Sequence, residues 1–403
     1  MNTRRNFLKT GAFGVAALGA TTLPTAALAT THSGSGRKKF KVAKAEAFAI
    51  PVPLISPFKM AKGTITHSDT VYVRLEDEAG RVGWGETFNV PQIYARDHKT
   101  IHNDLSGYLL PALVGLDPLE IATAHSAMDG ALPRCRDGKC GADMALYDLA
   151  GKQLGVSVST LLGGARVDEV PIIAALSILP PEEAAASAIK YVAKGHTYIK
   201  LKMGKNWKED AERAIAVRKA VGPDIILKGD ANTAYKMDEA LRFFDTVKDV
   251  DLQHMEQPID QYDINGAAFL AEHTNTPICA DESLQTLQDA LNILRADAAS
   301  AMVLKLVKNG GMHRTKQIVD FCQGVGVPSF LSSGTDMSLS VAAHLHCYAA
   351  VPGFERAMEV VNVLKDDVAK NPITWGATMK VPTGPGLGIE IDEKKIEKYR
   401  VKL

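Results

Sequence analysis

Three acidic residues follow three consecutive apolar segments in the middle of the chain. Asp230 ends I-I-L-K-G-D, Glu256 ends L-Q-H-M-E and Asp281 ends P-I-C-A-D. Their spacing of roughly 25 residues is about one strand–helix unit of a TIM barrel, in which all strand ends meet at one rim. Carboxylate oxygens are the ligands that hard divalent cations prefer. The pattern therefore predicts a metal site, with Mg²⁺ as the expected ion and Mn²⁺ as its alternative.

Lysines end the segments on either side of these acids. Lys200 and Lys202 belong to Y-I-K-L-K, and Lys305 ends A-M-V-L-K. Because side chains alternate along a strand, Lys200 and Lys202 point the same way, and repulsion between their ammonium groups favours proton loss from Lys202. We take all three lysines as catalytic candidates, with Lys202 and Lys305 as two bases. Next to a metal-held carboxylate, they would remove an α-proton and leave an enediolate that the cation stabilises.

Further polar residues are expected around this site. Lys228 and Asn232 share the face of Asp230, and Asn232 is expected to orient a ligand. Glu282 follows Asp281 directly, so it should point away from the metal and support its ligands. Lys308 stands three residues after Lys305 and is expected to face a loop or solvent.

The elements that must hold these residues alternate between apolar strands and amphipathic helices from residue 170 onward. Such alternation indicates a parallel sheet buried on both faces, and seven units with an eighth strand near residues 354–360 indicate a closed barrel. No G-x-G-x-x-G follows the first strand, so a dinucleotide fold has no support. The predicted fold class is α/β: a C-terminal modified (β/α)7β TIM-like barrel with an N-terminal α+β capping domain.

The capping domain is predicted over residues 40–165, the barrel over 166–373, and a tail over 374–403 that returns to the capping domain. Three antiparallel strands are expected within residues 40–87, followed by helices at 101–113, 118–128 and 142–154. Gly155 is expected to end the last helix. Residues 55–68 read as a polar loop long enough to cover a site.

Residues 1–29 are predicted to be an export signal. Arg4 and Arg5 precede a short Gly/Ala-rich apolar run that ends in Ala27-Leu28-Ala29, which is typical of a twin-arginine signal with an A-x-A cleavage site. An uncleaved membrane anchor is the alternative, but glycines break the run. Residues 30–39 read as a disordered lead-in. We expect the twin-arginine machinery to export the mature chain, placing it in the periplasm without a membrane span.

Composition excludes some partners. The chain has 46 basic and 46 acidic residues and no block of basic residues, so its sequence gives no sign of the clustered positive charge that nucleic-acid binding requires. Five cysteines are an odd number, and Cys279 lies in an apolar strand where it reads as a buried small side chain. Cys135 and Cys140 are close enough in sequence to leave a disulfide open, but no disulfide framework or zinc motif is expected.

Taken together, the motifs resemble the enolase superfamily, muconate-lactonizing-enzyme subgroup (the mandelate racemase/muconate lactonizing enzyme family), which includes dipeptide epimerases and N-acylamino-acid racemases. The matching pieces are K-x-K, D-A-N, M-E-Q-P, A-D-E-S and L-K-L-V-K-N-G-G, together with A-L-Y-D-L-A-G-K and L-L-G-G. The resemblance covers nearly all of residues 40–390. It implies Mg²⁺, a small-molecule carboxylate substrate, specificity loops at 55–68 and 88–97, and a homo-oligomer between a dimer and an octamer.

The resemblance also bears on the substrate. Dipeptide epimerases carry D-x-D on the eighth strand, whereas this chain reads R-A-M-E-V, with Ala357 at the first position and Glu359 remaining. Asp336 is the nearest equivalent of a glutamate that the family often has after the seventh strand, and Ser332 and Ser333 are candidate hydrogen-bond donors to substrate.

The expected activity is racemisation or epimerisation of an amino acid or N-substituted amino acid. Dehydration or cycloisomerisation of a hydroxy acid or lactone-forming substrate is the alternative, since the same two lysines support it. A non-catalytic exported binding protein is the remaining hypothesis.

Overall fold

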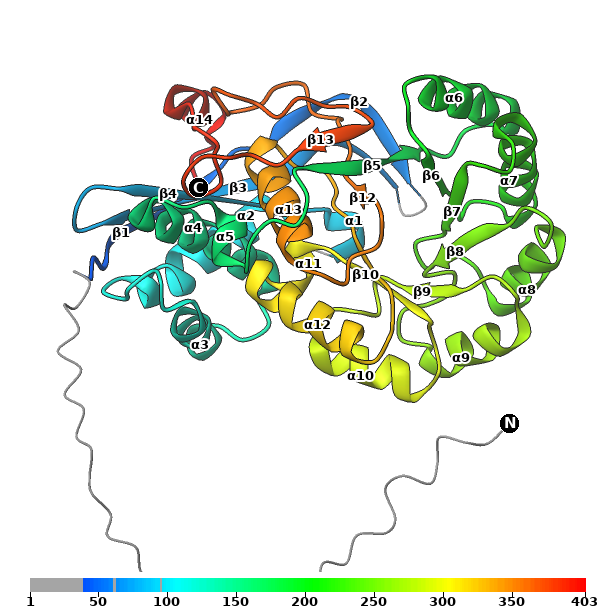
Figure 1. Cartoon of the computed structure of the whole chain (residues 1–403), viewed down its shortest axis with the longest axis horizontal. Coiled ribbons are helices and arrows are strands. Elements are labelled where there is room, and N and C mark those ends of the chain that lie inside the picture. Colours follow the sequence, from blue (N-terminus) through cyan, green and yellow to red (C-terminus); the bar gives the residue numbers. More distant parts are fainter. Residues whose placement is uncertain (1–38, 61–62, 95) are drawn as a thin grey trace, which may run out of the picture. The chain divides into compact units, whose positions relative to one another are not determined.

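Parallel strands arranged in a nearly closed ring dominate the described residues, which are 39–60, 63–94 and 96–403 of this computed structural model (Figure 1). Residues 40–403 form one unit. The predicted export signal and nearly all of the lead-in lie outside the described residues. The strands of the ring are β5 (Glu169–Leu176), β6 (Tyr198–Lys202), β7 (Ile226–Asp230), β8 (Leu252–Glu256), β9 (Ile278–Ala280), β10 (Ala301–Leu304), β11 (Ser329–Leu331) and β12 (Met358–Glu359).

The order around the ring is β11-β10-β9-β8-β7-β6-β5-β12, with each neighbouring pair parallel. Between β11 and β12 the backbone N–H of Glu355 donates to the carbonyl of Ser329 at 2.8 Å, which nearly closes the ring. The structure therefore confirms the predicted TIM-like barrel. Helices follow the strands and include α6 (Pro181–Ala193), α7 (Trp207–Val221), α8 (Met237–Thr246), α9 (Ile264–His273) and α10 (Leu287–Arg295), which lie on the outer side of the ring (Figure 1). They are followed by the short helix α11 (Leu306–Asn309) and by α12 (Met312–Gly324) and α13 (Ser338–Ala350).

Strand alternation divides the residues of each barrel strand between two faces. On β6, Ile199 and Leu201 are fully buried and belong to the large apolar core, whereas Lys200 and Lys202 point into the ring. Lys202 stands in register with Asp230 on β7, and Asp230 with Glu256 on β8. The parallel register therefore places the chemistry-bearing residues of neighbouring strands at one level of the barrel mouth.

The N-terminal part is an α+β domain with an antiparallel sheet. Its strands are β1 (Val42–Ala49), β2 (Val52–Met60), β3 (Gly63–Asp77) and β4 (Val82–Asn89), and β3 pairs with each of the other three. Its helical segments are α1 (Pro91–Tyr94), α2 (His98–Asp104), η1 (Leu105–Leu109), η2 (Pro111–Leu113), α3 (Ile121–Ala131), α4 (Arg136–Leu154) and α5 (Val158–Leu161). Gly155 ends α4 in the left-handed conformation at φ 70°, as predicted.

Several sequence predictions for this domain are wrong. Residues 55–68 are not a loop: β2 and the start of β3 form a hairpin across them. Pro53 and Pro57 make β2 hard to recognise as a strand in the sequence. Prolines are tolerated there because β2 is an edge strand that pairs with β3. The predicted helix at 101–113 is broken into α2, a π turn and a 3₁₀ turn, and α4 begins before the predicted residue 142.

Buried carboxylates join this domain to the barrel. Glu86 on β4 is fully buried and accepts hydrogen bonds from the backbone N–H groups of Met337 (2.7 Å) and Ser340 (3.0 Å) at the start of α13. Asp143 on α4 accepts from the backbone N–H of Met312, the first residue of α12, at 2.6 Å. Each carboxylate thus satisfies helix N-terminal donors that would otherwise be unpaired.

The tail only partly follows its prediction. β13 (Thr378–Lys380) pairs antiparallel with barrel strand β5, so this part of the tail extends the barrel sheet instead of joining the capping domain. The tail then returns to the capping domain as predicted: the N–H of Gly386 donates to the carbonyl of Val156 at 2.9 Å and its carbonyl accepts from the N–H of Val158 at 2.8 Å. After α14 (Glu393–Tyr399), the N–H of Val401 donates to the carbonyl of Ala49 at 3.0 Å.

All five cysteines are free and buried, so Cys135 and Cys140 are not bridged. Within the described ranges, every helix is too short or too polar to traverse a lipid bilayer.

Candidate active site

The predicted acidic residues meet at the carboxyl ends of three neighbouring strands. Asp230 ends β7, Glu256 ends β8 and Asp281 follows β9 directly. One carboxylate oxygen of each lies within 4.8 Å of the others, and all three residues are buried. Burial of three negative charges in so small a volume costs much free energy unless cations lie among them.

Lys202 and Lys305 reach this triad from opposite sides of the barrel. The strands that carry them, β6 and β10, have β7, β8 and β9 between them on one side and β5, β12 and β11 on the other. The Lys202 ammonium pairs with Asp230, and the Lys305 ammonium pairs with Asp281 at 2.6 Å. Both lysines line the same cavity of about 80 Å³. The predicted pair is therefore brought together around one small space.

Lys200 forms ion pairs with two carboxylates of the triad and with Glu359. Its Nζ lies 2.6 Å from Glu256, 2.7 Å from Glu359 and 3.0 Å from Asp230, and the residue is 1% exposed. Burial alone would lower the pKa of Lys200, but these carboxylates raise it well above its ordinary value. Lys200 therefore stays charged, and its place is that of an ion-pairing residue rather than of a group that exchanges protons.

Lys308 corrects the sequence prediction, because it faces neither loop nor solvent. It is buried, and its Nζ donates to a carboxylate oxygen and to the carbonyl of Asp281, each at 2.7 Å. The cause is the short helix α11, whose single turn carries the side chain back over the barrel mouth before Gly310 ends it in the left-handed conformation. The two glycines that follow Lys308-Asn309 favour a loop in the sequence, and they hide this single helical turn.

Asn232 contacts the triad and Glu282 contacts Asn232, and their supporting roles stay predictions. The Asn232 side chain donates to Glu282 at 3.0 Å, and its backbone N–H donates to Asp230 at 3.0 Å. The second carboxylate oxygen of Glu282 is buried and has no hydrogen-bond partner among the described residues. Burial, together with the charges of Asp281 and Asp230, raises the pKa of Glu282 to about 7.

Gln257 is a positioning residue that sequence reasoning missed. Its side-chain oxygen accepts from the backbone N–H of Asp281 at 3.1 Å and from the Ser283 hydroxyl at 2.9 Å. Gln257 itself adopts a left-handed backbone with φ 34°, an uncommon conformation for a residue other than glycine. Gln257 follows Glu256 directly in the chain, and its side chain binds the backbone of Asp281. It therefore connects two of the three metal-binding candidates.

Lys228 and His254 are buried polar residues that do not line the active-site cavity. The Lys228 ammonium lies 3.8 Å from the centre of the Phe330 ring, and burial lowers the pKa of Lys228 to about 8. Burial also lowers the pKa of His254, to about 4, so His254 is neutral near pH 7. Lys228 thus contacts the barrel interior instead of substrate space.

The capping domain covers the cavity with apolar side chains. Phe58 and Ile65 come from the β2–β3 hairpin, and Phe88 and Val90 from the end of β4. Both segments predicted to control specificity therefore line the space between the two lysines. Ser333 lines it as well, and its hydroxyl is buried without a partner among the described residues, which leaves it available to a ligand.

The other predicted substrate contacts divide into two groups. Glu359 lines the cavity, but Lys200 and the Ser332 hydroxyl both donate to it at 2.7 Å. Asp336 is buried and accepts from the Ser340 hydroxyl and the Gly334 N–H, so it holds the loop between β11 and α13 and is absent from the cavity lining. Ala357 belongs to an apolar interior cluster with Ile173 and Tyr198.

The donor set fits a hard divalent cation. Three clustered carboxylates provide the oxygen ligands that Mg²⁺ takes. In this structure the ammonium groups of Lys200, Lys202, Lys305 and Lys308 donate to these carboxylates. The residues that would hold the ion are Asp230, Glu256 and Asp281.

Comparison with known proteins agrees with this geometry. Residues 183–395 match the enolase C-terminal domain-like family, and residues 44–163 match the mandelate racemase / muconate lactonizing enzyme N-terminal domain. The chain belongs to the mandelate racemase/muconate lactonizing enzyme family of the enolase superfamily. The resemblance inferred from the motifs is thereby confirmed.

Relatives in this superfamily cover nearly the whole chain. An N-succinyl-L-Arg/Lys racemase of Bacillus cereus is 28% identical over 90% of this chain and 98% of its own length, and its crystal structure superposes with a TM-score of 0.86. An L-Ala-D/L-Glu epimerase of Bacillus subtilis is 32% identical over 87% of this chain and 96% of its own length. A chloromuconate cycloisomerase of Cupriavidus necator is 28% identical over 87% of this chain and 96% of its own length.

A solved dipeptide epimerase of Cytophaga hutchinsonii, complexed with Mg and the dipeptide D-Ala-L-Val, is 25% identical, covers 89% of this chain and 98% of that chain, and has a TM-score of 0.84. The curated relatives named here are a racemase, an epimerase and a cycloisomerase, and the chain is an isomerase of this superfamily.

The position of Lys200 predicts a large effect on stability. Without divalent cation, Lys200→Met should lower the free energy of unfolding by about 3–5 kcal/mol, because it leaves buried carboxylates without their central partner. Saturating Mg²⁺ should restore more stability to this variant than to the unchanged protein, since a bound ion takes over the neutralisation. Urea denaturation with and without Mg²⁺ measures both quantities.

Lys44→Met is the matched control, because Lys44 pairs with Glu76 on the surface and its side chain is 65% exposed. It should cost less than about 1 kcal/mol. An equal loss in the two variants would contradict the ion-pairing position of Lys200.

Proposed function

We propose that this protein is a Mg²⁺-dependent racemase or epimerase that exchanges the α-proton of an N-substituted amino acid. The observation that carries the proposal is the placement of Lys202 and Lys305, which approach one cavity from opposite strands and each pair with a different triad carboxylate. Two bases on opposite sides of one carbon allow its inversion, because one can remove the proton and the other can return a proton to the opposite face.

The metal assignment rests on the carboxylate triad and on a relative solved with Mg. A bound divalent cation stabilises the negative charge that develops on a substrate carboxylate when its α-proton leaves. The chain's own groups keep water from this space: Phe58, Ile65, Phe88 and Val90 close the cavity on the side of the capping domain. Exclusion of water strengthens each electrostatic interaction inside the site.

The lysines carry the proton. One ε-amine, as the free base, takes the proton from the α-carbon, so that the C–H bond breaks and an N–H bond forms. The other lysine, as an ammonium on the opposite side, returns a proton to the same carbon and inverts it. Asn232 holds the Lys202 side of the site, since its side-chain oxygen lies 3.4 Å from the Lys202 Nζ.

The preference for an N-substituted substrate comes from Glu359. A free substrate amine needs a carboxylate partner, but Glu359 already accepts from Lys200 and Ser332, and the neighbouring inward position is Ala357. An N-acyl group removes the positive charge and with it this requirement. The B. cereus relative named as acting on N-succinyl amino acids supports the same reading.

Cycloisomerisation is the second candidate, supported by the chloromuconate cycloisomerase among the relatives. Together with β-elimination of a hydroxy acid, it would use the same lysines but change the carbon skeleton or release a β-group. Proton NMR in D₂O separates the hypotheses: loss of the α-proton signal from an intact N-acyl amino acid supports racemisation, whereas new vinylic, keto-acid or lactone signals support the alternatives. Tight substrate binding without any exchange would favour a binding protein.

Single-lysine variants should divide the exchange reaction by stereochemistry. Lys202→Ala should slow α-proton exchange from one enantiomer and Lys305→Ala from the other, each by about 10²–10⁴-fold, because each base faces one side of the α-carbon. Exchange into D₂O measured separately on the two enantiomers gives the result. Lys205→Ala, which removes an exposed lysine from the loop after β6, should leave both rates unchanged. Full exchange of both enantiomers by both active-site variants would exclude the two-base mechanism.

We also propose that the mature protein is exported through the twin-arginine pathway, on the basis of Arg4, Arg5 and the A-L-A sequence before Thr30. Replacing both arginines by lysine should retain the precursor in the cytoplasm, whereas the unchanged chain should appear in the periplasm with Thr30 as its first residue. Cell fractionation followed by N-terminal sequencing measures this, with Arg37→Lys as the control. Periplasmic delivery of the double-lysine variant would contradict the proposal.

A further inference from the structure

A cavity of about 340 Å³ lies between the capping domain and the barrel. Among the described residues, none lines both this cavity and the active-site cavity. Arg134, Arg136 and Lys139 line it from the capping domain, and Gln285, Leu287 and Arg314 line it from the barrel. The cavity is therefore separate from the site of the proposed reaction.

Positive charge dominates the lining of this cavity. Four of its side chains are basic, and among the described residues that line it only Asp129 is acidic. Asp129 is shared by two of the cations: it lies 2.6 Å from the Lys139 ammonium and 2.5 Å from the Arg314 guanidinium. One carboxylate among four cations leaves an excess of three positive charges.

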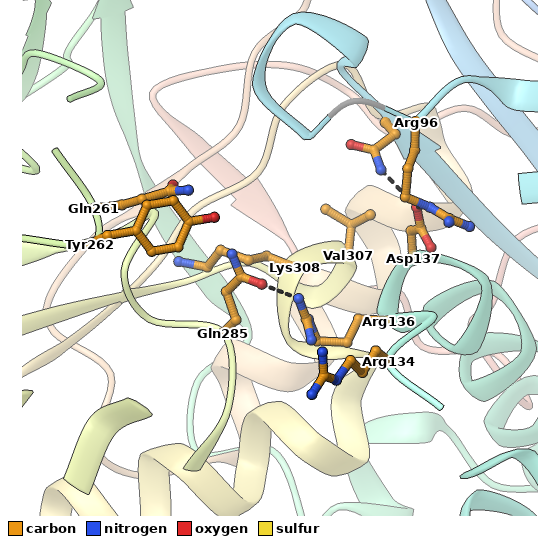
Figure 2. A pocket seen from close by; sticks show the side chains of 10 residues that line it. Arg96, Arg134, Arg136, Asp137, Gln261, Tyr262, Gln285, Val307 and Lys308 are labelled. Atoms are coloured by element: carbon orange, nitrogen blue, oxygen red, sulfur yellow. Dashed lines mark hydrogen bonds and ion pairs between the residues drawn. The ribbon is translucent and has the colours of Figure 1, made fainter. Parts of the chain in front are cut away.

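Arg134 and Arg136 are the two cations of the lining that have no carboxylate partner. The Arg136 guanidinium donates to the neutral Gln285 side chain, as Figure 2 shows, and no ion pair of Arg136 occurs among the described residues. Arg134 is exposed, and within the part of the chain that the structure describes its side chain makes no hydrogen bond or ion pair. Burial lowers the pKa of Arg136, and the positive charge of Arg134 also lowers it. The two guanidinium groups thus lie close enough to repel each other.

The charges of Asp289 and Asp137 act on Arg136 in the opposite direction, but both carboxylates have other partners. Asp289 accepts from the backbone N–H and the hydroxyl of Thr286, at 2.8 and 2.9 Å, at the start of α10. Asp137 accepts from the Arg96 guanidinium at 2.7 Å. The two arginines of the cavity therefore keep a positive charge that an anion from solution can neutralise.

We infer that this cavity binds a small phosphate monoester, whose phosphate group is held by Arg134 and Arg136 of the capping domain and by Arg314 of the barrel. Guanidinium groups suit this role because they bind phosphate oxygens through two parallel hydrogen bonds. A phosphate monoester carries nearly two negative charges at pH 7, which matches the excess positive charge better than a carboxylate does. Leu287 and Ile318 give the organic part an apolar wall, and the volume lies within the range of small-molecule sites, roughly 300–1,000 Å³.

A phosphate group bound here connects the two domains. Arg134 and Arg136 stand at the start of α4 in the capping domain, whereas Arg314 belongs to barrel helix α12. Binding should therefore stabilise the folded chain and raise its melting temperature. The site uses none of the residues that line the active-site cavity, so it does not depend on the proposed reaction.

Calorimetric titration with glycerol phosphate tests the inference, with glycerol as the neutral ligand and inorganic phosphate as the anion without an organic part. The full chain is first freed of divalent cations by dialysis, so that no phosphate binds through a metal ion in the active site. Glycerol phosphate should bind at one site per chain with a dissociation constant below about 1 mM. Inorganic phosphate should bind more weakly, and glycerol should not bind.

Variants locate the site. Arg134→Gln and Arg136→Gln should each weaken the binding of glycerol phosphate about tenfold, the size expected for the loss of a charge-assisted hydrogen bond, and their combination should abolish it. Arg242→Gln is the matched control and should keep the full affinity, because Arg242 is a surface arginine on α8 with a side chain that is 65% exposed. Arg134→Gln keeps the test valid if Arg136→Gln does not fold, since the Arg134 side chain is exposed.

Three results would overturn the inference. Glycerol phosphate that does not bind at concentrations up to about 10 mM would exclude the site. Affinity that persists in the double variant would place the ligand elsewhere on the chain. Inorganic phosphate that binds as tightly as glycerol phosphate would assign the cavity to the free ion and not to a monoester.

Discussion

The structure depends on the neutralisation of carboxylates that are buried together. Asp230, Glu256 and Asp281 have oxygens within 4.8 Å of one another and almost no exposure to water. Mutual repulsion and desolvation would each raise the pKa of such groups, yet the adjacent lysines hold the pKa of Asp230 and of Asp281 well below the ordinary value. A site built this way keeps its ligands ionised, which is the state that a divalent cation requires.

The barrel and the capping domain serve this one constraint. Parallel register brings residues from β6, β7 and β8 to the same level, and the eight-stranded ring sets β6 and β10 opposite each other. The capping domain then removes water from the remaining side. Buried carboxylates such as Glu86 accept hydrogen bonds from backbone N–H groups at helix N-termini of the barrel. These hydrogen bonds hold the capping domain on the barrel in addition to apolar contacts.

The barrel and the metal-binding candidates could be predicted from the sequence. Residues that recur at the ends of successive strands come together at one rim of a barrel. Strand alternation was enough to place Lys200, Lys202 and Asp230 on one face. Lys308 could not be predicted, since its burial depends on a single helical turn that the sequence presents as a glycine-rich loop. The edge strand β2 was missed because its prolines argue against a strand.

Manganese binding followed by electron paramagnetic resonance tests the central claim most directly, since Mn²⁺ takes the same oxygen ligands as Mg²⁺. The account predicts one bound ion per chain, displaced by Mg²⁺, with an affinity at least about 100-fold weaker in Asp281→Asn and unchanged in the surface variant Asp238→Asn. Absence of binding to the unchanged protein, or equal affinity in the Asp281 variant, would contradict it.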